Sequence, residues 1–276
     1  MQTAMNPPVV YRHLHRIDEL QAVTTLQAKI WAFQPEMIVP THMLHSLVYG
    51  GGCLIGADIG GAIVGFALGF PARRGDTWLL WSHMAGVLPE YQRRTIGLSL
   101  KMAQRAWALR SGFDTIAWTF DPMQARNAQF NLHRLRATAN LYHADFYGEM
   151  PDMLNAGLPT DRLEVTWALN APRVQALDRA SETPAMTRVA LDRCALRQME
   201  DGALLAHPVE PESATCFVEV PEDVALLKQH NFAHAQQWQL ALRRTLSHLF
   251  ETGYVASDFT VEDDHHYFVL TNDSSV

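Results

Sequence analysis

The stretch Trp81-Ser-His-Met-Ala-Gly-Val-Leu-Pro-Glu-Tyr-Gln-Arg-Arg-Thr-Ile-Gly-Leu98 has the pattern of a strand that turns directly into a helix. An apolar run leads into the turn Pro89-Glu90-Tyr91, and a helical pattern follows Gly97. The first N–H groups of a helix have no partner inside it, and the helix dipole favours negative charge there. Arg93 and Arg94 add guanidinium donors that suit phosphate. The stretch therefore predicts a site for a ligand that carries a pyrophosphate; the alternative is an ordinary turn with solvated arginines.

The order of these residues resembles motif A of the GCN5-related N-acetyltransferases (GNAT), in which a strand runs into Gln/Arg-x-x-Gly-x-Gly/Ala. Here the motif reads Gln92-Arg93-Arg94-Thr95-Ile96-Gly97, followed by Leu98. The resemblance implies that these seven residues bind the pyrophosphate of acetyl-CoA or another acyl-CoA. Thr95 stands where the family usually has its first glycine, and a β-branched residue tolerates positive φ poorly. We therefore expect either ordinary helical angles at Thr95 or weaker coenzyme binding.

Composition limits the ligands that this chain can take. The 276 residues carry a net charge of −7, with 48% hydrophobic and 18% charged residues, as in a globular protein. An acidic chain is a poor non-specific binder of nucleic acid. A local basic loop on such a chain suits a small anionic ligand better than a polyanion.

Three features predict a protein of the cytoplasm with no membrane partner. Cys53, Cys194 and Cys216 show no CxxC spacing and are expected to be free, buried thiols in a reducing compartment. The longest apolar run, Ala62–Phe70, is too short to cross a bilayer. Residues 1–10 lack the basic and apolar regions of a signal peptide.

The pattern along residues 9–170 alternates between strands and helices. The expected strands are Val9–Leu14, Cys53–Ile59, Ala62–Pro71, Trp78–Val87, Thr115–Phe120, Leu141–Tyr147 and Leu163–Leu169. The expected helices are Leu20–Trp31 with Asp18 as its cap, His42–Tyr49, Ile96–Ser111 and Ala125–Leu135. This order resembles that of the GNAT family, which implies an α/β (α+β) fold with a mixed central sheet and flanking helices. We predict an acetyltransferase domain over residues 1–172.

Residues 173–276 are predicted to form an accessory subdomain after a polar linker at 178–187. The expected elements are β-α-β-β: strand Thr215–Val220, helix Ala233–Phe250 and a hairpin of Tyr254–Phe259 with His265–Thr271. This order is similar to the second half of a GNAT fold, so the segment is interpreted as a degenerate half-repeat. Its strand-to-helix turn, Pro221-Glu222-Asp223, is acidic and is not expected to bind phosphate.

The whole chain also resembles a bacterial group of GNAT acetyltransferases of similar length without an assigned substrate. The resemblance rests on Ser82-His83-Met84, Thr119-Phe120-Asp121-Pro122, Arg126-Asn127-Ala128 with Phe130-Asn131-Leu132, Phe146-Tyr147-Gly148-Glu149 and Gly157-Leu158-Pro159-Thr160-Asp161-Arg162. It supplies a fold and a coenzyme but no acceptor.

His83 is the candidate general base. Its ordinary pKa lies near neutral pH, and arylalkylamine N-acetyltransferases are similar in having a histidine at this spacing before the motif. Strand alternation places residues 81, 83, 85 and 87 on one face. In the family the acetyl group lies where this strand separates from its neighbour, which implies that backbone N–H groups of Ala85, Gly86 and Val87 bind the coenzyme. The alternative is a core histidine bonded to a carbonyl group.

The general acid is harder to assign. The family often has a tyrosine in the later helix, but here Leu132 stands at that position and Arg136 replaces the usual glycine. Tyr142, His143 and Tyr147 on the next expected strand are the substitutes. Asn127 and Asn131, one helical turn apart, are expected to share a face and to bond the coenzyme. For each of these residues a purely structural role is the alternative.

These features together predict an acyl-CoA-dependent N-acyltransferase that acetylates an amine of a small molecule. Direct attack on bound acetyl-CoA is favoured over a covalent intermediate because no cysteine lies on the catalytic stretch. The alternatives are a non-catalytic module that binds or senses acyl-CoA, and an interaction protein that has lost the ligand. No metal is expected, because the adjacent His265 and His266 point to opposite faces of a strand. Pairing of free strand edges between two copies would give a homodimer.

Overall fold

The computed structural model describes residues 7–150, 157–178, 185–207 and 213–272. Its contacts divide the chain into two compact units, Met1–Trp118 and Thr119–Val276. The boundary between these compact units falls within a strand. The predicted boundary at residue 172 instead separates an acetyltransferase domain from an accessory subdomain, and it stays a prediction. Residues 179–184 of the predicted linker lie outside the described residues. Helices that could span a membrane are absent from the described ranges.

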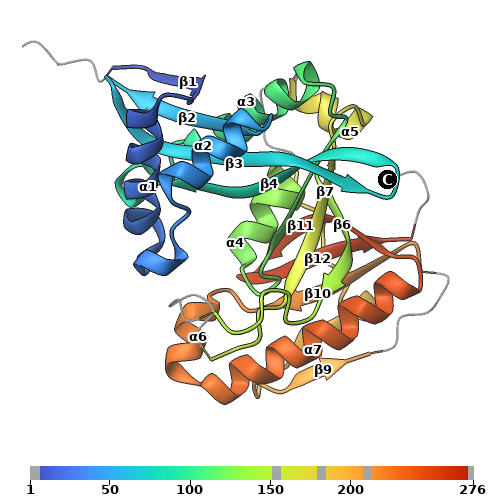
Figure 1. Cartoon of the computed structure of the whole chain (residues 1–276). Helices are drawn as coiled ribbons and strands as arrows, with labels where there is room; N and C mark the ends of the chain where they lie inside the picture. Colours follow the sequence, from blue (N-terminus) through green and yellow to red (C-terminus); the bar gives the residue numbers. More distant parts are fainter. Residues whose placement is uncertain (1–6, 151–156, 179–184, 208–212, 273–276) are drawn as a thin grey trace, which may run out of the picture. The chain divides into compact units, whose positions relative to one another are not determined.

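The first unit is a mixed sheet with helices on both faces (Figure 1). Its strands are β1 (Val9–His13), β2 (Cys53–Ile59), β3 (Ala62–Arg74), β4 (Thr77–Val87) and β5 (Thr115–Phe120), which ends in the second unit. Its helices are α1 (Ile17–Trp31), α2 (Thr41–Tyr49) and α3 (Ile96–Arg110), with short 3₁₀ turns at Pro35–Met37 and Pro89–Tyr91. The strands pair in the order of the chain, antiparallel except for the parallel pair β4–β5.

Two apolar layers hold this sheet. Leu20, Val23 and Leu26 of α1 repeat at helical spacing and pack with Phe66 and Leu68 of β3. Helix α3 packs on the other face against β2, β3 and β4. The turn between β2 and β3 has φ of 60° at Gly60 and 92° at Gly61, as a two-residue hairpin requires. Asp18 does not cap α1, because the helix begins one residue earlier.

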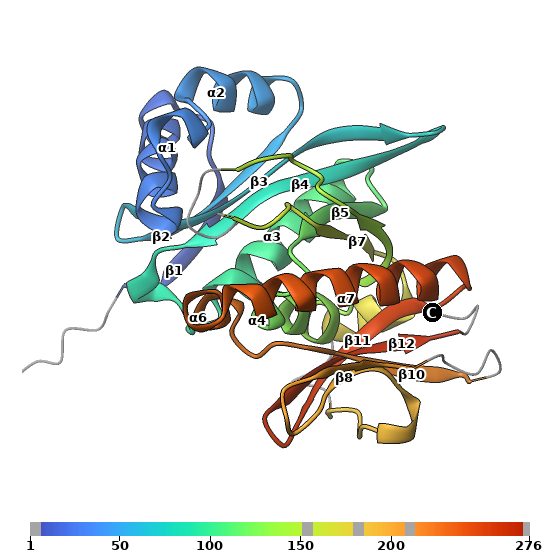
Figure 2. The ribbon, with the colours of Figure 1, turned by 90° about the horizontal axis from the view of Figure 1, so that it is seen from below.

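The second unit is also a mixed sheet, and Figure 2 shows α7 running across its strands. Its strands are β6 (Thr138–His143), β7 (Arg162–Ala168), β8 (Cys194–Gln198), β9 (Leu204–Ala206), β10 (Thr215–Val220), β11 (Val255–Glu262) and β12 (His265–Thr271). Its helices are α4 (Ala125–Ala128), a π-helical turn (Gln129–Arg134), α5 (Pro172–Gln175), α6 (Val224–His230) and α7 (Phe232–Glu251), with 3₁₀ turns at Ala176–Asp178 and Leu191–Arg193. Trp238, Leu242, Leu246 and Leu249 form the buried stripe of α7.

The sequence predicted the C-terminal β-α-β-β extension and the mixed sheets with flanking helices, and both are confirmed. It missed β8, β9 and α6. The expected strand Leu141–Tyr147 was wrong at its end, because β6 stops at His143 and Asp145 turns the chain with a φ of 48°. All three cysteines are free and buried, as predicted.

Candidate active site

Strand β4 leaves its parallel partner part-way along its length. The ladder between β4 and β5 consists of Leu80 opposite Ile116 and Trp81 opposite Ala117. Antiparallel pairing of β4 with β3 continues as far as Val87. Residues 82–87 therefore have one edge without a strand partner on β5 in the part of the chain that the structure describes. N–H and C=O groups along that edge need another partner, which a ligand can supply.

A β-bulge lies at the same place. Leu68 of β3 is opposite Met84 and Gly69 is opposite Ser82, so His83 is the extra residue of β4. A bulge re-aims the side chain that it carries, and bulges are over-represented beside active sites. The imidazole of His83 is exposed and lies 5.9 Å from the ring of Phe70, centre to centre. Although the side chain reaches solvent, the protein atoms packed around the ring partly desolvate it and lower its pKa below the ordinary value of 6.5, so the ring is neutral near pH 7.

The bulge corrects the expected alternation of β4. Trp81, Met84 and Gly86 are opposite the alternate residues 70, 68 and 66 of β3, so these three share one face. Ala85 and Val87 are opposite residues 67 and 65 and lie on the other face. The prediction that residues 81, 83, 85 and 87 share a face is therefore wrong. Gly86 also has a packing role, because a Cβ atom there would lie 2.7 Å from Cζ2 of Trp31.

The loop between β4 and α3 has left-handed backbone at two residues that are not glycine. The φ angle is 61° at Arg93 and 59° at Thr95, with ordinary φ at Arg94 between them. Such alternation is typical of loops whose N–H groups converge on an anion. The expectation of helical angles at Thr95 is wrong, because this threonine has the conformation that a glycine would adopt. Gln92 stabilises the loop by donating from Nε2 to the carbonyl oxygen of Val87 at 2.9 Å.

Helix α3 begins without a side-chain cap. Thr95 precedes it, but its hydroxyl donates to the carbonyl oxygen of Arg94 at 2.6 Å and caps no helical N–H. Helix α6 differs, because the Asp223 carboxylate accepts from the N–H groups of Ala225 and Leu226 at 2.9 and 3.0 Å. The start of α6 thus has the carboxylate of Asp223 on its first N–H groups, whereas no side chain caps the start of α3, whose N–H groups could bind an external anion.

Gly97 and its neighbours leave room at this helix end. A Cβ atom on Gly97 would meet no protein atom within 4 Å, and the residue has no positive φ. Neither packing nor backbone conformation therefore requires a glycine here, and the absence of a side chain would allow a ligand to approach closely. Ile96 is buried and Leu98 is half-buried, so these two side chains anchor the first turn. Arg93 and Arg94 are exposed, and the Arg94 guanidinium lies 5.5 Å from the ring centre of Tyr91.

A buried polar cluster lies behind the bulge, and sequence reasoning missed it. The Lys101 ammonium donates to Ser82 Oγ at 3.0 Å and to Gln104 Oε1 at 2.8 Å. It also lies 3.9 Å from the ring centre of Trp118. Lys101 is only 3% exposed, and burial lowers its pKa to about 7. The sequence signal for the burial of Lys101 is that it directly follows Leu100, which lies on the buried face of α3.

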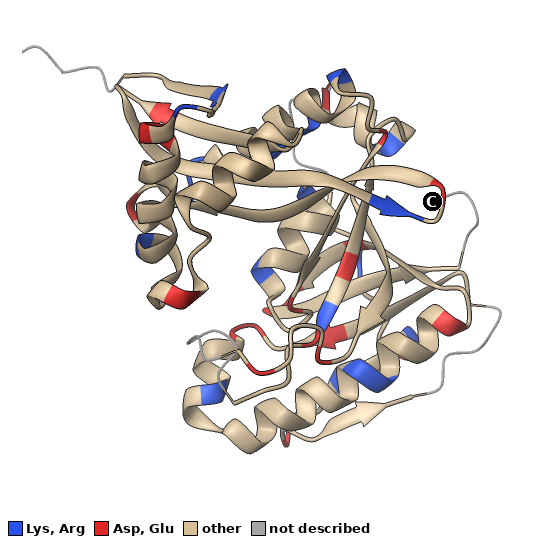
Figure 3. Cartoon of the chain, viewed as in Figure 1, with Lys and Arg blue, Asp and Glu red and all other residues tan. Residues whose placement is uncertain are grey.

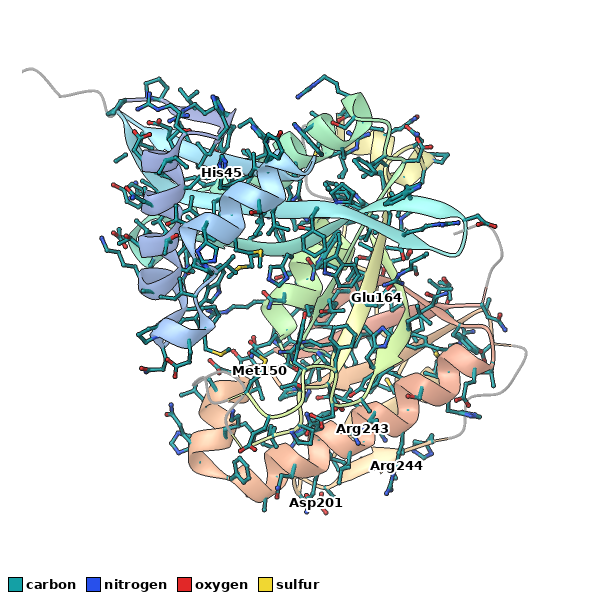
Figure 4. The ribbon with its side chains drawn as sticks, in the orientation of Figure 1. His45, Met150, Glu164, Asp201, Arg243 and Arg244 are labelled. Atoms are coloured by element: carbon teal, nitrogen blue, oxygen red, sulfur yellow. The ribbon has the colours of Figure 1, made fainter. Side chains whose placement is uncertain are left out.

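The second unit holds the other predicted catalytic residues. Tyr142 donates from its hydroxyl to Asp161 Oδ2 at 2.6 Å, and Arg243 binds the same carboxylate at 2.6 and 2.9 Å. Figure 4 labels Arg243 on α7 and Glu164 on β7. Burial, together with the Asp161 carboxylate, raises the pKa of Tyr142 far above its ordinary value. Its proton is thus firmly held. His143 is likewise engaged, with Nε2 at 2.9 Å from Oε2 of Glu164.

Tyr147 is the freer phenol. It lies in the turn after β6 and is 46% exposed. Its hydroxyl is 3.3 Å from Thr119 Oγ1, at the end of β5, and the Arg162 guanidinium lies 5.3 Å from its ring centre. Unlike that of Tyr142, this hydroxyl is not committed to a carboxylate.

Asn127 and Asn131 have different surroundings. Asn127 is exposed on α4, whereas Asn131 is 5% exposed in the π-helical turn. The two side chains thus differ in burial, and their shared face and their bonds to the coenzyme stay predictions. Arg136, which follows this turn, has a φ of 58°, so it too has the backbone of the glycine that it replaces.

The comparison with protein families agrees with this geometry. Residues 19–134 match the model of the Acetyltransferase (GNAT) family. This region is a GNAT acetyltransferase region. The predicted family and the acetyltransferase class are thereby confirmed for residues 19–134, which include β4, the loop and α3. No curated protein matches the chain.

Three solved structures show the extent of the likeness. The yncA protein of Salmonella typhimurium with acetyl-CoA has 16% identity and a TM-score of 0.48, covering 59% of this chain and 95% of its own. The ribosomal-protein-S18-alanine N-acetyltransferase of Escherichia coli has 14% identity and a TM-score of 0.47, covering 58% and 92%. Arabidopsis thaliana NAA60 with a bisubstrate analogue has 14% identity and a TM-score of 0.47, covering 59% and 100%.

The left-handed backbone at Thr95 predicts an unusual gain from glycine. A left-handed residue other than glycine costs about 1–2 kcal/mol, and glycine costs about 0.5–1 kcal/mol in chain entropy. Thr95→Gly should therefore raise the free energy of unfolding, measured in urea, by up to about 1 kcal/mol. Thr252→Gly is the control, because Thr252 also flanks a helix but has a φ of −91°, so it should only lose stability. Equal losses in both variants would contradict the strain.

Lys101 predicts a pH dependence of stability. Its pKa is about 7 in the folded chain against an ordinary 10.5, so between these values the unfolded chain binds the extra proton. The free energy of unfolding therefore rises with pH across this window. Between pH 7 and pH 9 the wild type should gain about 2 kcal/mol relative to Lys101→Met, in urea unfolding at each pH. Parallel curves for the two proteins would show that the lysine does not titrate in this window.

Proposed function

We propose that this GNAT region transfers an acyl group, acetyl in the simplest case, from acyl-CoA to an amine of a small molecule. One observation carries the proposal: His83 is the bulged residue of β4, at the point where the strand loses its partner and leads towards an uncapped helix start. That arrangement combines a neutral base with free backbone donors and an anion site. All three features lie within the first unit.

The coenzyme would lie along these donors. N–H groups of the loop from Gln92 to Thr95 and of the first turn at Ile96–Leu98 would hold the pyrophosphate, with Arg93 and Arg94 adding charge. Acidic and basic residues are interspersed over the ribbon (Figure 3), and the net charge is −7. The two arginines of the loop would attract a compact phosphate ligand locally, whereas the negative charge of the whole chain disfavours a large polyanion such as nucleic acid.

The chemistry then follows from the protonation states. The acceptor ammonium must lose a proton, which neutral His83 can accept. The amine nitrogen attacks the thioester carbonyl carbon, a C–N bond forms and the C–S bond breaks, and the nitrogen releases a second proton to solvent to give the neutral amide. Unpaired N–H groups among Ala85, Gly86 and Val87 would stabilise the negative charge on the carbonyl oxygen. The leaving thiolate must take up a proton; of the two predicted phenols, Tyr147 has the hydroxyl that is not committed to a carboxylate, whereas Tyr142 donates to Asp161.

Direct attack is preferred to a covalent intermediate. Burial raises the pKa of Cys53 and Cys216 to about 12 and that of Cys194 to about 11. Such thiols carry almost no thiolate at neutral pH and are poor nucleophiles. Among the described residues, no group of three or more His, Cys, Asp and Glu side chains is placed to hold a metal ion.

His83→Gln tests the base directly. Thiol release from acetyl-CoA, measured with tyramine, spermidine or lysine as acceptor, should fall at least tenfold because the proton acceptor is lost. Coenzyme affinity should change less than twofold. The lowered pKa of His83 means that the base form persists on acidification, so wild-type turnover should hold down to below pH 6.5.

The control is His45→Gln, on the exposed side of α2, which should leave turnover unchanged. Unchanged turnover in His83→Gln would remove His83 as the base. Coenzyme binding without turnover of any amine would favour the non-catalytic acyl-CoA module. Absence of both would leave an interaction role.

A further inference from the structure

Three buried polar side chains form a closed triangle in the first unit. Lys101 Nζ donates to Ser82 Oγ and to Gln104 Oε1, and the Ser82 hydroxyl donates to the same Gln104 oxygen at 3.0 Å. The exposed fractions are 3% for Lys101, 6% for Ser82 and 0% for Gln104. Every bond of the triangle is thus made away from water, where hydrogen bonds are strong and unpaired groups are costly.

The triangle lies where two functional elements meet. Ser82 directly precedes the bulged His83, and it is the last residue of β4 before the register with β3 changes. Lys101 and Gln104 belong to α3, whose first turn is the candidate pyrophosphate site. The ladder with β5 ends at Trp81, so it cannot fix this part of β4. Beyond Trp81, the hydrogen bonds that join Ser82 to Lys101 and Gln104 hold β4 to α3.

A purely structural role does not account for the choice of lysine. Burying an ammonium group costs free energy that an apolar side chain of the same length would not cost. The cost is visible in the pKa of Lys101, which burial lowers to about 7. A lysine instead fixes the orientation of Ser82 relative to α3, because its hydrogen bonds and its contact with the Trp118 ring are all made in one geometry.

We propose that Lys101 and Ser82 are positioning residues, which hold the bulge of β4 and thereby set the direction of the His83 imidazole. This role rests on the proposed function, since it matters for turnover only if His83 is the base. It connects the coenzyme helix to the catalytic strand through two hydrogen bonds. Neither residue needs to touch the substrate.

The test compares Ser82→Ala, Lys101→Met and the double variant with wild type in the full chain. Each single variant should lower kcat at least tenfold with the Kd for CoA within twofold. The double variant should lower kcat no further than the worse single one, because both break the same triangle. Ser82→Thr keeps the hydroxyl and should restore most of the lost kcat.

Ser257→Ala is the matched control. Ser257 is also 6% exposed and also accepts a side-chain bond, from Thr271 Oγ1 at 3.1 Å, but it belongs to β11. It should lose stability without losing kcat. An equal fall of kcat in Ser257→Ala, or unchanged kcat in Ser82→Ala, would overturn the positioning role. If Lys101→Met does not fold, the variants of Ser82 and the Ser257→Ala control still test the positioning role.

An NMR titration separates this inference from the proposed function. The His83 imidazole is identified among 13 histidines by its absence from the spectrum of His83→Gln. Its midpoint, below 6.5 in wild type, should move towards 6.5 in Ser82→Ala and stay unchanged in Ser257→Ala. This holds even if wild type turns over no amine, an outcome that would refute the function alone. An unmoved midpoint in Ser82→Ala would refute the positioning.

Discussion

A backbone N–H that leaves a β-ladder must find another partner, and this constraint organises the first unit. Strand β4 stops pairing with β5 after Trp81, and the bulge at His83 follows within two residues. The same strand then runs through a short turn into α3, whose first N–H groups have no side-chain cap. The bulge, the edge of β4 beyond the β5 ladder and the uncapped helix start therefore follow one another along residues 83–96. The proposed base and the proposed coenzyme site lie on this stretch, and the buried Lys101 lies on the helix that follows it.

The loop keeps the backbone of a glycine-containing motif without its first glycine. Thr95 and Arg93 have positive φ, and Arg136 repeats the feature after the π-helical turn. Strain of this kind persists only where the surrounding structure imposes it, and it concentrates at functional sites. Thr95 and Arg136, which stand where the family usually has glycine, thus have the left-handed backbone that a glycine would adopt.

The sequence predicted the elements well where local pattern decides them. Strands Cys53–Ile59 and Thr115–Phe120 and the hairpin at Gly60-Gly61 agree with the structure because apolar runs and turn residues are local signals. The bulge at His83 was not predictable, since its register depends on which residue of β3 lies opposite. For the same reason the face of Ala85 was assigned wrongly.

The candidate site was only partly predictable. Motif A located the loop and helix start, because glycine, arginines and a helix boundary are all legible in sequence. Tyr142 and Tyr147 could not be ranked, since the difference lies in Asp161, which is 19 residues from Tyr142 along the chain. Lys101 looked like an ordinary helix lysine, and only packing against Trp118 shows it to be buried.

Gly97→Ala tests whether the start of α3 binds the pyrophosphate of CoA. Apart from its chain neighbours and the nearby backbone of its own helix, the added methyl group would meet no protein atom within 4 Å, so a loss of binding would indicate a clash with the ligand. Calorimetric titration with CoA should give a Kd at least tenfold higher in the variant, while its melting temperature stays equal or rises because alanine favours helix. Equal affinity in the two proteins, or no binding of millimolar CoA by wild type, would contradict a pyrophosphate site at the start of α3.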